Sequence, residues 1–175
     1  MPPIALIIIP LVIIGTLIYA ATRPNTFRTE RSAIINATQA KIFGNINDLS
    51  KWQAWSPWEK LDKNVKRTLS EPPKGLGAIY EWEGNRKVGK GSMEIVEAKA
   101  STKVVMKLEF YKPFRASNMA EFTLTKKGTS TEITWAMYGP QPYKSKLMST
   151  LMDIDGMVGK QFEEGLANLK ALVEK

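Results

Sequence analysis

The side chains available for chemistry are limited at the outset, because the chain contains no histidine and no cysteine. Nucleophilic systems of the Ser-His-Asp or Cys-His kind are therefore excluded, as are zinc sites built from these two residue types, c-type haem attachment and disulfide bonds. Acid–base catalysis would have to use Asp, Glu, Lys, Arg or Tyr. We accordingly expect no catalytic residue set, no bound metal and no cofactor.

Two pairs of carboxylates have the closest spacing among the acidic residues. Asp153 and Asp155 are two positions apart in a helical segment, so their side chains do not face each other. Asp155 borders an apolar stripe and is the residue whose pKa would be raised if this were an active site; a solvated helix border is the simpler interpretation. Glu81 and Glu83 share the solvent face of an expected strand. Neither pair forms a convincing acid–base site.

Three tryptophans recur at a spacing of three in the segment KWQAWSPWEK. Trp52 and Trp55 would share one side of a short helix, and Pro57 would turn Trp58 elsewhere. The cluster fits a lid over an apolar ligand, an aromatic contact with the bilayer interface, or a plug that packs the end of the core.

The net charge of +8 favours anionic partners. No run of five or six basic residues appears, and stacking on nucleic-acid bases needs Lys or Arg interleaved with the aromatic residues. We therefore expect no specific nucleic-acid partner. Attraction to an anionic bilayer is the better explanation of the charge, because the N-terminal segment would hold the body beside one.

The N-terminal segment is apolar, and every charged residue of the chain lies after Thr22. Residues 4–21 would extend about 27 Å as a helix, close to the ~30 Å hydrocarbon core of a bilayer. Tyr19 falls at the expected interface, and Arg23 and Arg28 follow it. These features predict a transmembrane anchor over residues 1–24, ahead of a domain over residues 25–175.

Other interpretations of this segment are a cleaved signal peptide and a buried core helix. The apolar run is longer than a typical signal sequence core, and no basic residue precedes it. Because the positive flank lies on the C-terminal side, we expect a single-pass protein of the cell (inner) membrane whose C-terminal domain faces the cytoplasm.

The body alternates between strand and helix patterns. Val104, Met106, Leu108 and Phe110 would share one strand face, which is typical of an antiparallel sheet with one solvated face. Strands are expected at residues 27–36, 65–70, 78–83, 88–98, 103–111, 117–125 and 131–138, short helices at 39–46 and 49–55, and one long helix of about 28 residues whose apolar stripe runs from Leu147 to Leu172. The fold class is therefore α+β, with a curved sheet packed on the long helix.

Three glycines interrupt the long helix, namely Gly156, Gly159 and Gly165. An interior glycine costs up to ~1 kcal/mol relative to alanine. Such positions indicate a close approach of the helix backbone to the sheet, a bend, or space for a ligand.

Large side chains gather on the inner surfaces that this arrangement would enclose. A filled core is the simpler interpretation, but a curved sheet that closes on one helix leaves internal space, and Met-rich linings adapt to varied ligands. We expect the ligand-binding residues to be Trp55, Tyr80, Trp82, Met93, Met106, Phe110, Trp135 and Met152.

Three segments resemble the SRPBCC superfamily: RSAIINATQAKIFGNINDLSKWQAWSPW, GAIYEWEGNRKVGKGSMEI and TEITWAMYG followed by MDIDGMVGKQFEEGLANLK. They are similar to its bacterial polyketide cyclase/dehydrase-like branch, which is related to START lipid-transfer domains and the major birch pollen allergen. The resemblance covers Arg31 to Lys175. It implies a helix-grip fold, in which a seven-stranded antiparallel sheet wraps round the C-terminal helix and encloses a hydrophobic cavity. A membrane helix ahead of such a domain is familiar in this branch.

The function expected first is a membrane-anchored, monomeric binding module for a hydrophobic small molecule or lipid. A cyclase/dehydratase-type enzyme that uses a cavity carboxylate or tyrosine is the alternative, although the polar cavity residues of such cyclases are not matched here. A protein-interaction or co-chaperone-like module is the second alternative. A buried carboxylate facing Tyr80 across the cavity would favour the enzyme, and a filled core with an exposed apolar patch would favour a protein partner.

Overall fold

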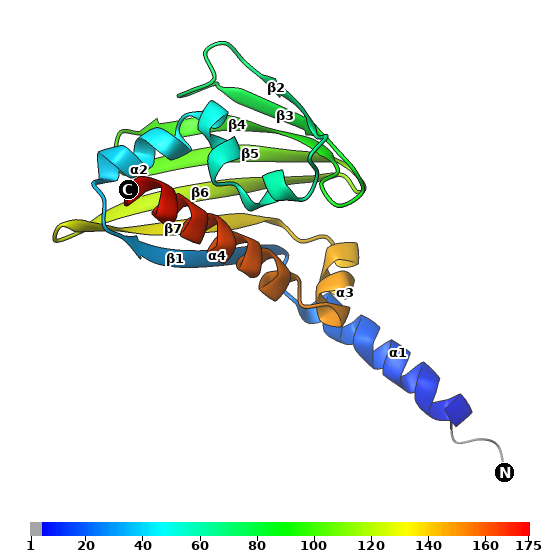
Figure 1. The fold of residues 1–175 in the computed structure, drawn as a ribbon. Coiled ribbons are helices and arrows are strands. Elements are labelled where there is room, and N and C mark those ends of the chain that lie inside the picture. Colours follow the sequence, from blue (N-terminus) through cyan, green and yellow to red (C-terminus); the bar gives the residue numbers. More distant parts are fainter. Residues whose placement is uncertain (1–4) are drawn as a thin grey trace.

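A computed structural model describes residues 5–175, with side chains described from Ile8 onward (Figure 1). In chain order the elements are α1 (Ala5–Thr22), β1 (Thr26–Ile35), α2 (Gln39–Ile46), the 3-10 helices η1 (Leu49–Ala54) and η2 (Pro57–Lys60), β2 (Lys66–Leu69), β3 (Ile79–Glu83), β4 (Lys90–Lys99), β5 (Lys103–Lys112), β6 (Ala116–Lys127), β7 (Ser130–Pro140), α3 (Tyr143–Leu151) and α4 (Ile154–Val173).

The seven strands form one antiparallel sheet in the order β1-β7-β6-β5-β4-β3-β2. Figure 1 shows the sheet curving around α4, with α2 and the 3-10 helices beside it on the same face. The alternation read from the sequence is present, because Phe122 and Leu124 of β6 are buried while Thr123 between them is exposed. The predicted α+β class, the seven strands and the C-terminal helix are therefore confirmed.

The prediction of one long C-terminal helix is wrong, because the chain breaks between α3 and α4. Met152 adopts an extended conformation, with φ −134° and ψ 139°. The backbone N–H of Gly156 donates a hydrogen bond of 2.8 Å to Oδ1 of Asp153, which is therefore the N-cap of a new helix. Aspartate is a favoured N-cap residue. Both helices have an apolar side, so the apolar spacing continues across the break. Periodicity alone therefore does not reveal that two helices are present.

The N-terminal helix forms where a helix was predicted, and Pro10 lies inside it. In the part of the chain that the structure describes, no helix has both the length and the apolar content needed to cross a membrane. The transmembrane helix predicted over residues 4–21 is therefore not supported, and residue 4 itself lies outside the described residues.

The core is packed around Trp135 of β7. Its ring is stacked on Phe162 of α4, with centroids 4.3 Å apart and planes 11° from parallel. It also lies 4.8 Å from the ring of Phe122 and 5.7 Å from that of Trp55. Trp52 contacts the same cluster edge-on and is buried, like Trp55. The tryptophans at spacing three thus occupy the position expected of a core plug.

Two of the glycines of α4 lie where another part of the molecule approaches its backbone. A Cβ atom at Gly165 would lie 2.7 Å from the Trp135 ring and 3.1 Å from the Pro57 ring. A Cβ atom at Gly159 would collide with the Arg31 guanidinium, which crosses the helix there. Close backbone approach therefore explains both glycines.

The two glycines should respond differently to alanine. We expect Gly165→Ala to lower the free energy of unfolding by about 1–3 kcal/mol, because the Trp135 ring is packed on both faces and has no space to move. Gly159→Ala should stay within about 1 kcal/mol of wild type, because Arg31 is a flexible side chain whose surface ion pairs contribute little and alanine favours the helix. Urea unfolding followed by tryptophan fluorescence measures both values. Equal destabilisation by the two variants would contradict this explanation.

Candidate ligand-binding groove

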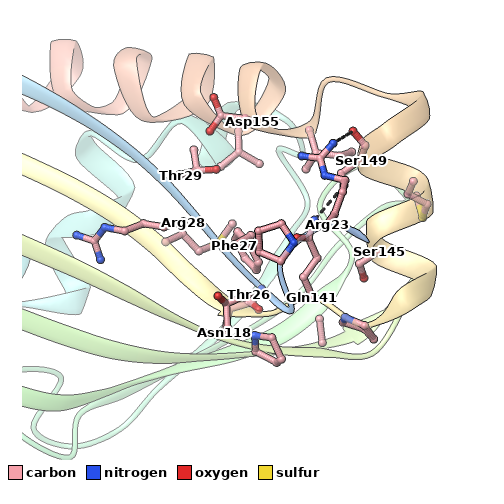
Figure 2. Close-up of a pocket in the computed structure, with 18 of the residues that line it drawn as sticks. Arg23, Thr26, Phe27, Arg28, Thr29, Asn118, Gln141, Ser145, Ser149 and Asp155 are labelled. Atoms are coloured by element: carbon pink, nitrogen blue, oxygen red, sulfur yellow. Dashed lines mark hydrogen bonds between the residues drawn. The ribbon is translucent and has the colours of Figure 1, made fainter. Parts of the chain in front are cut away.

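An open groove of about 1270 Å³ lies between the sheet and the N-terminal end of α4 (Figure 2). Its walls come from the junction of α1 and β1, the start of β6, the end of β7, α3 and the first turns of α4. Apolar side chains in the lining are Phe27, Met137, Met148, Leu151, Met152, Ile154 and Val158. Polar side chains in the lining include Asn25, Asn118, Gln141, Ser145 and Ser149.

The stack of Trp135 on Phe162 lies at the inner end of this groove. Met137 follows Trp135 by two residues and so projects from the same face of β7. Val158 precedes Phe162 by four residues and so lies on the same side of α4. The groove is therefore the open part of the space between sheet and helix, and the aromatic cluster fills the part beyond it.

The residues predicted to bind a ligand are distributed between these two regions. Met152 lines the groove. Trp55, Tyr80, Met93, Met106 and Trp135 are buried members of the hydrophobic core, Trp82 packs against that core, and Phe110 lies 5.9 Å from the Trp82 ring. The structure thus places six of the eight predicted residues in or against the packed interior, Phe110 beside one of these six, and Met152 in the groove. Their role in binding stays a prediction.

Sequence reasoning missed most of the groove because its lining comes from the ends of elements. Phe27 is the second residue of β1, Asn118 is the third residue of β6, and Gln141 follows β7. Strand ends carry a weak alternation signal, since few residues remain to establish the period. The Asp153-x-x-Gly156 spacing is a local signal that could have located the corner between α3 and α4, because an aspartate three residues before a glycine N–H can cap a new helix.

Hydrogen bonds tie α3 to the junction of α1 and β1 beside the groove. Nζ of the buried Lys146 donates to Oδ1 of Asn25 at 2.6 Å. Arg23 donates from Nη1 to the backbone oxygen of Ser149 at 3.3 Å, and Gln141 donates from Nε2 to Oγ of Ser149 at 2.9 Å. Figure 2 shows Arg23 and Ser149 directed toward each other across the groove wall. These polar groups are therefore engaged in holding the walls together.

The two carboxylates of the groove are also engaged. Asp153 caps α4. Asp155 accepts a hydrogen bond from Arg31 Nη2 at 3.2 Å, and Arg31 also donates to Glu163 at 3.0 Å. Hydrogen bonds from the Thr29 hydroxyl and from Arg31 lower the pKa of Asp155. The raised pKa considered for Asp155 is therefore wrong in sign, because the carboxylate is stabilised in its charged form.

A carboxylate does face Tyr80. The Tyr80 hydroxyl donates to Oε1 of Glu59 at 2.6 Å, and Arg67 donates from Nε to Oε2 of Glu59 at 2.8 Å. Burial, and then the hydrogen bond to Glu59, raise the pKa of Tyr80, which makes its hydroxyl a weak acid. Glu59 forms an ion pair with Arg67, and none of the three residues lines the groove. The geometry is that of a structural ion pair. No local sequence pattern predicts this contact, because Glu59 and Tyr80 are 21 positions apart.

The fold resembles several solved structures at low sequence identity. The KanY protein matches with a TM-score of 0.64 and 16% identity, over 87% of this chain and 100% of that chain. Protein CV1439 from Chromobacterium violaceum gives 0.59 and 15%, over 87% and 99%. Ara h 8.0201 gives 0.57 and 10%, over 85% and 97%. None of the curated proteins compared with the chain matches it. These likenesses establish the helix-grip fold.

A family model extends the match from fold to sequence. The model described as "Polyketide cyclase / dehydrase and lipid transport" matches residues 26–174. The match begins at the first residue of β1 and ends after α4. It confirms the resemblance drawn from the three sequence segments. The chain therefore belongs to the polyketide cyclase / dehydrase and lipid transport family, within the SRPBCC superfamily.

Proposed function

We propose that the protein binds a hydrophobic small molecule or lipid in the groove between the sheet and the start of α4. The observation that carries this proposal is the set of large apolar side chains in the groove lining, together with the engagement of Arg23, Asn25, Gln141 and Ser149 in hydrogen bonds within the groove wall. Family membership supports the same class of ligand. Such a site holds its ligand mainly by shape and by removal of apolar surface from water.

The volume of the groove and the flexible side chains of its lining favour an elongated apolar ligand. Burial of apolar surface contributes about 2.5 kcal/mol for each 100 Å². Met137, Met148 and Met152 supply flexible thioether side chains, which adapt to ligands of different shape. A volume of about 1270 Å³ exceeds the ~300–1,000 Å³ of typical drug-sized pockets, which favours a ligand with a long chain.

The enzyme alternative finds less support in the same groove. A cyclase or dehydratase needs a proton donor and acceptor that converge on the substrate. Among the described lining residues the carboxylates are Asp153 and Asp155, and both are held by structural hydrogen bonds. Binding without catalysis is therefore our first proposal.

We propose further that α1 attaches the protein to a membrane, with the body as a monomer on the cytoplasmic side. Support comes from the apolar side chains of α1, because Ile9, Leu11 and Ile13 are each more than half exposed. Figure 1 shows this helix projecting away from the rest of the molecule. A lipid environment would cover these side chains, and Arg23 and Arg28 on the C-terminal side favour a cytoplasmic body.

The ligand site can be tested by filling the groove. Val158→Trp should weaken the binding of a fluorescent fatty-acid analogue at least tenfold, or about 1.4 kcal/mol, because the new ring would occupy the groove. Met93→Leu is the matched control in the core and should leave affinity unchanged, since it conserves volume. Fluorescence titration gives both dissociation constants. Weakening by Met93→Leu alone would instead place the ligand among the core residues.

The enzyme alternative can be tested at Asp155. Its side chain is 59% exposed, so Asp155→Asn should change the free energy of unfolding by less than about 1 kcal/mol and leave ligand affinity unchanged. Because the folded-state pKa lies below the unfolded one, the small wild-type advantage should be present above pH ~4 and disappear as the pH falls through the folded pKa. Urea unfolding at several pH values measures it. Loss of substrate turnover in Asp155→Asn with intact ligand binding would favour the enzyme.

Membrane attachment can be tested by placing charge in α1. The double variant Ile9→Asp with Ile13→Asp should move the protein from the membrane pellet to the supernatant, because each aspartate in a bilayer costs about 2.5–3.5 kcal/mol. The control Ile34→Asp with Val96→Asp changes two exposed apolar residues of the sheet and should remain in the pellet. Ultracentrifugation of cell lysates provides the measurement. A soluble wild-type protein would refute the attachment.

A further inference from the structure

We propose that the turn between β5 and β6, residues 113–115, is a second contact with an anionic bilayer surface, so that the groove opens at the lipid surface. This inference rests on the proposed membrane attachment through α1. The inference goes further than that attachment, because it assigns the bilayer as the partner of the β5–β6 turn, which is not part of α1.

The turn presents a large apolar side chain to solvent. Phe114 is 73% exposed, whereas the aromatic residues of the core are almost fully buried. It lies between Pro113 and Arg115, in the short connection from Lys112 at the end of β5 to Ala116 at the start of β6. An exposed aromatic ring beside basic residues is the combination that binds at a membrane interface.

Unpaired positive charge surrounds Phe114. Lys112 and Arg115 flank it, and Arg86 and Lys87 lie in the turn between β3 and β4. None of these four forms an ion pair with another residue that the structure describes. At the opposite end of the sheet Lys99, Lys103 and Lys127 pair with Glu97 and Glu132, whereas Lys126 forms no ion pair with a described residue. The free charge therefore complements an anionic surface at one end of the molecule.

The same end of the molecule carries α1. Arg115 and Ala116 line the groove together with Arg23 and Pro24 at the root of that helix. Lys112 and Pro113 line a second hollow, of about 320 Å³, together with Arg86 of the β3–β4 turn. Figure 1 shows α1 leaving the body at one end and the C-terminus lying at the other. The root of α1 therefore lies at the same end of the molecule as the β3–β4 turn, the β5–β6 turn and the mouth of the groove.

The position of α1 relative to this face is fixed by bonds to α3. The Tyr143 hydroxyl donates to the backbone oxygen of Leu17 at 3.1 Å, and Lys146 holds Asn25 immediately after the helix. Ala20 is fully buried at the contact. A helix held in this way is not a loose tether, so its insertion in a bilayer would also determine where the β5–β6 turn lies.

The consequence concerns how the ligand reaches its site. With Phe114 and its basic neighbours at the lipid surface, Arg115 at the rim of the groove faces head groups and the apolar lining behind it faces acyl chains. A lipid or apolar molecule would enter from the bilayer without crossing water, which avoids the cost of exposing its apolar surface.

Single spin labels can test the contact, because the chain contains no cysteine. Phe114→Cys, Ile13→Cys and the control Thr129→Cys, in the β6–β7 turn at the other end, would each be labelled with a nitroxide in the full chain. Vesicles of phosphatidylcholine, with or without roughly one-third phosphatidylglycerol, provide neutral and anionic surfaces. We expect the labels at 13 and 114 to become accessible to oxygen dissolved in the anionic bilayer, while the label at 129 stays in water.

Charge can be tested in the same assay. Lys112→Gln with Arg115→Gln should lower the bilayer partition of the label at 114 by roughly tenfold in anionic vesicles. The control Lys126→Gln with Lys127→Gln removes the same charge at the other end and should have no effect.

Each outcome separates the two proposals. A label at 114 that stays as aqueous as that at 129, while the label at 13 is in lipid, overturns this inference and leaves the attachment intact. A label at 13 in water refutes the attachment itself. Equal insertion of 114 into neutral and anionic vesicles overturns the role of charge.

Discussion

The stack of Trp135 on Phe162 is the interaction on which the rest of the interior depends. It connects β7, the strand beside the edge strand β1, to the middle of α4 at a ring distance of 4.3 Å, and the tryptophans of the η1–η2 segment pack around it. Gly165 permits this distance because a side chain there would meet the Trp135 ring. The stack therefore separates a part of the space between sheet and helix that core side chains fill from the open groove.

The break between α3 and α4 makes the open part accessible. A continuous helix would have carried the Leu147–Met152 segment along the axis of α4, whereas the Asp153 cap turns α3 away toward α1. The helix α3 forms one wall of the groove, and its side chains also donate hydrogen bonds to the C-terminal part of α1 and to Asn25 immediately after it. The relation between the groove and any membrane that contains α1 is therefore set by one short helix.

Much of the fold could be predicted from the sequence. The apolar residues Val104, Met106, Leu108 and Phe110 at every second position located β5, and the helix expected at residues 39–46 is α2. The site was harder to predict. Tyr80, Trp82 and Met93 were correctly placed on the inner face, but a period of two residues does not reveal whether that face meets a ligand or another side chain.

Sequence alone determined the chemistry that this protein lacks and the faces that its elements bury, because residue type and local period are properties of the chain itself. The absence of histidine and cysteine, the inner face of each long strand and the apolar N-terminal segment all belong to this class. Tertiary structure decided where the interior is full and where it is open. Arg31 crossing α4 at Gly159, Glu59 meeting Tyr80, and Arg115 meeting Arg23 at one groove join residues far apart in the chain. Such contacts depend on how whole elements pack, and the local pattern of a sequence does not contain that information.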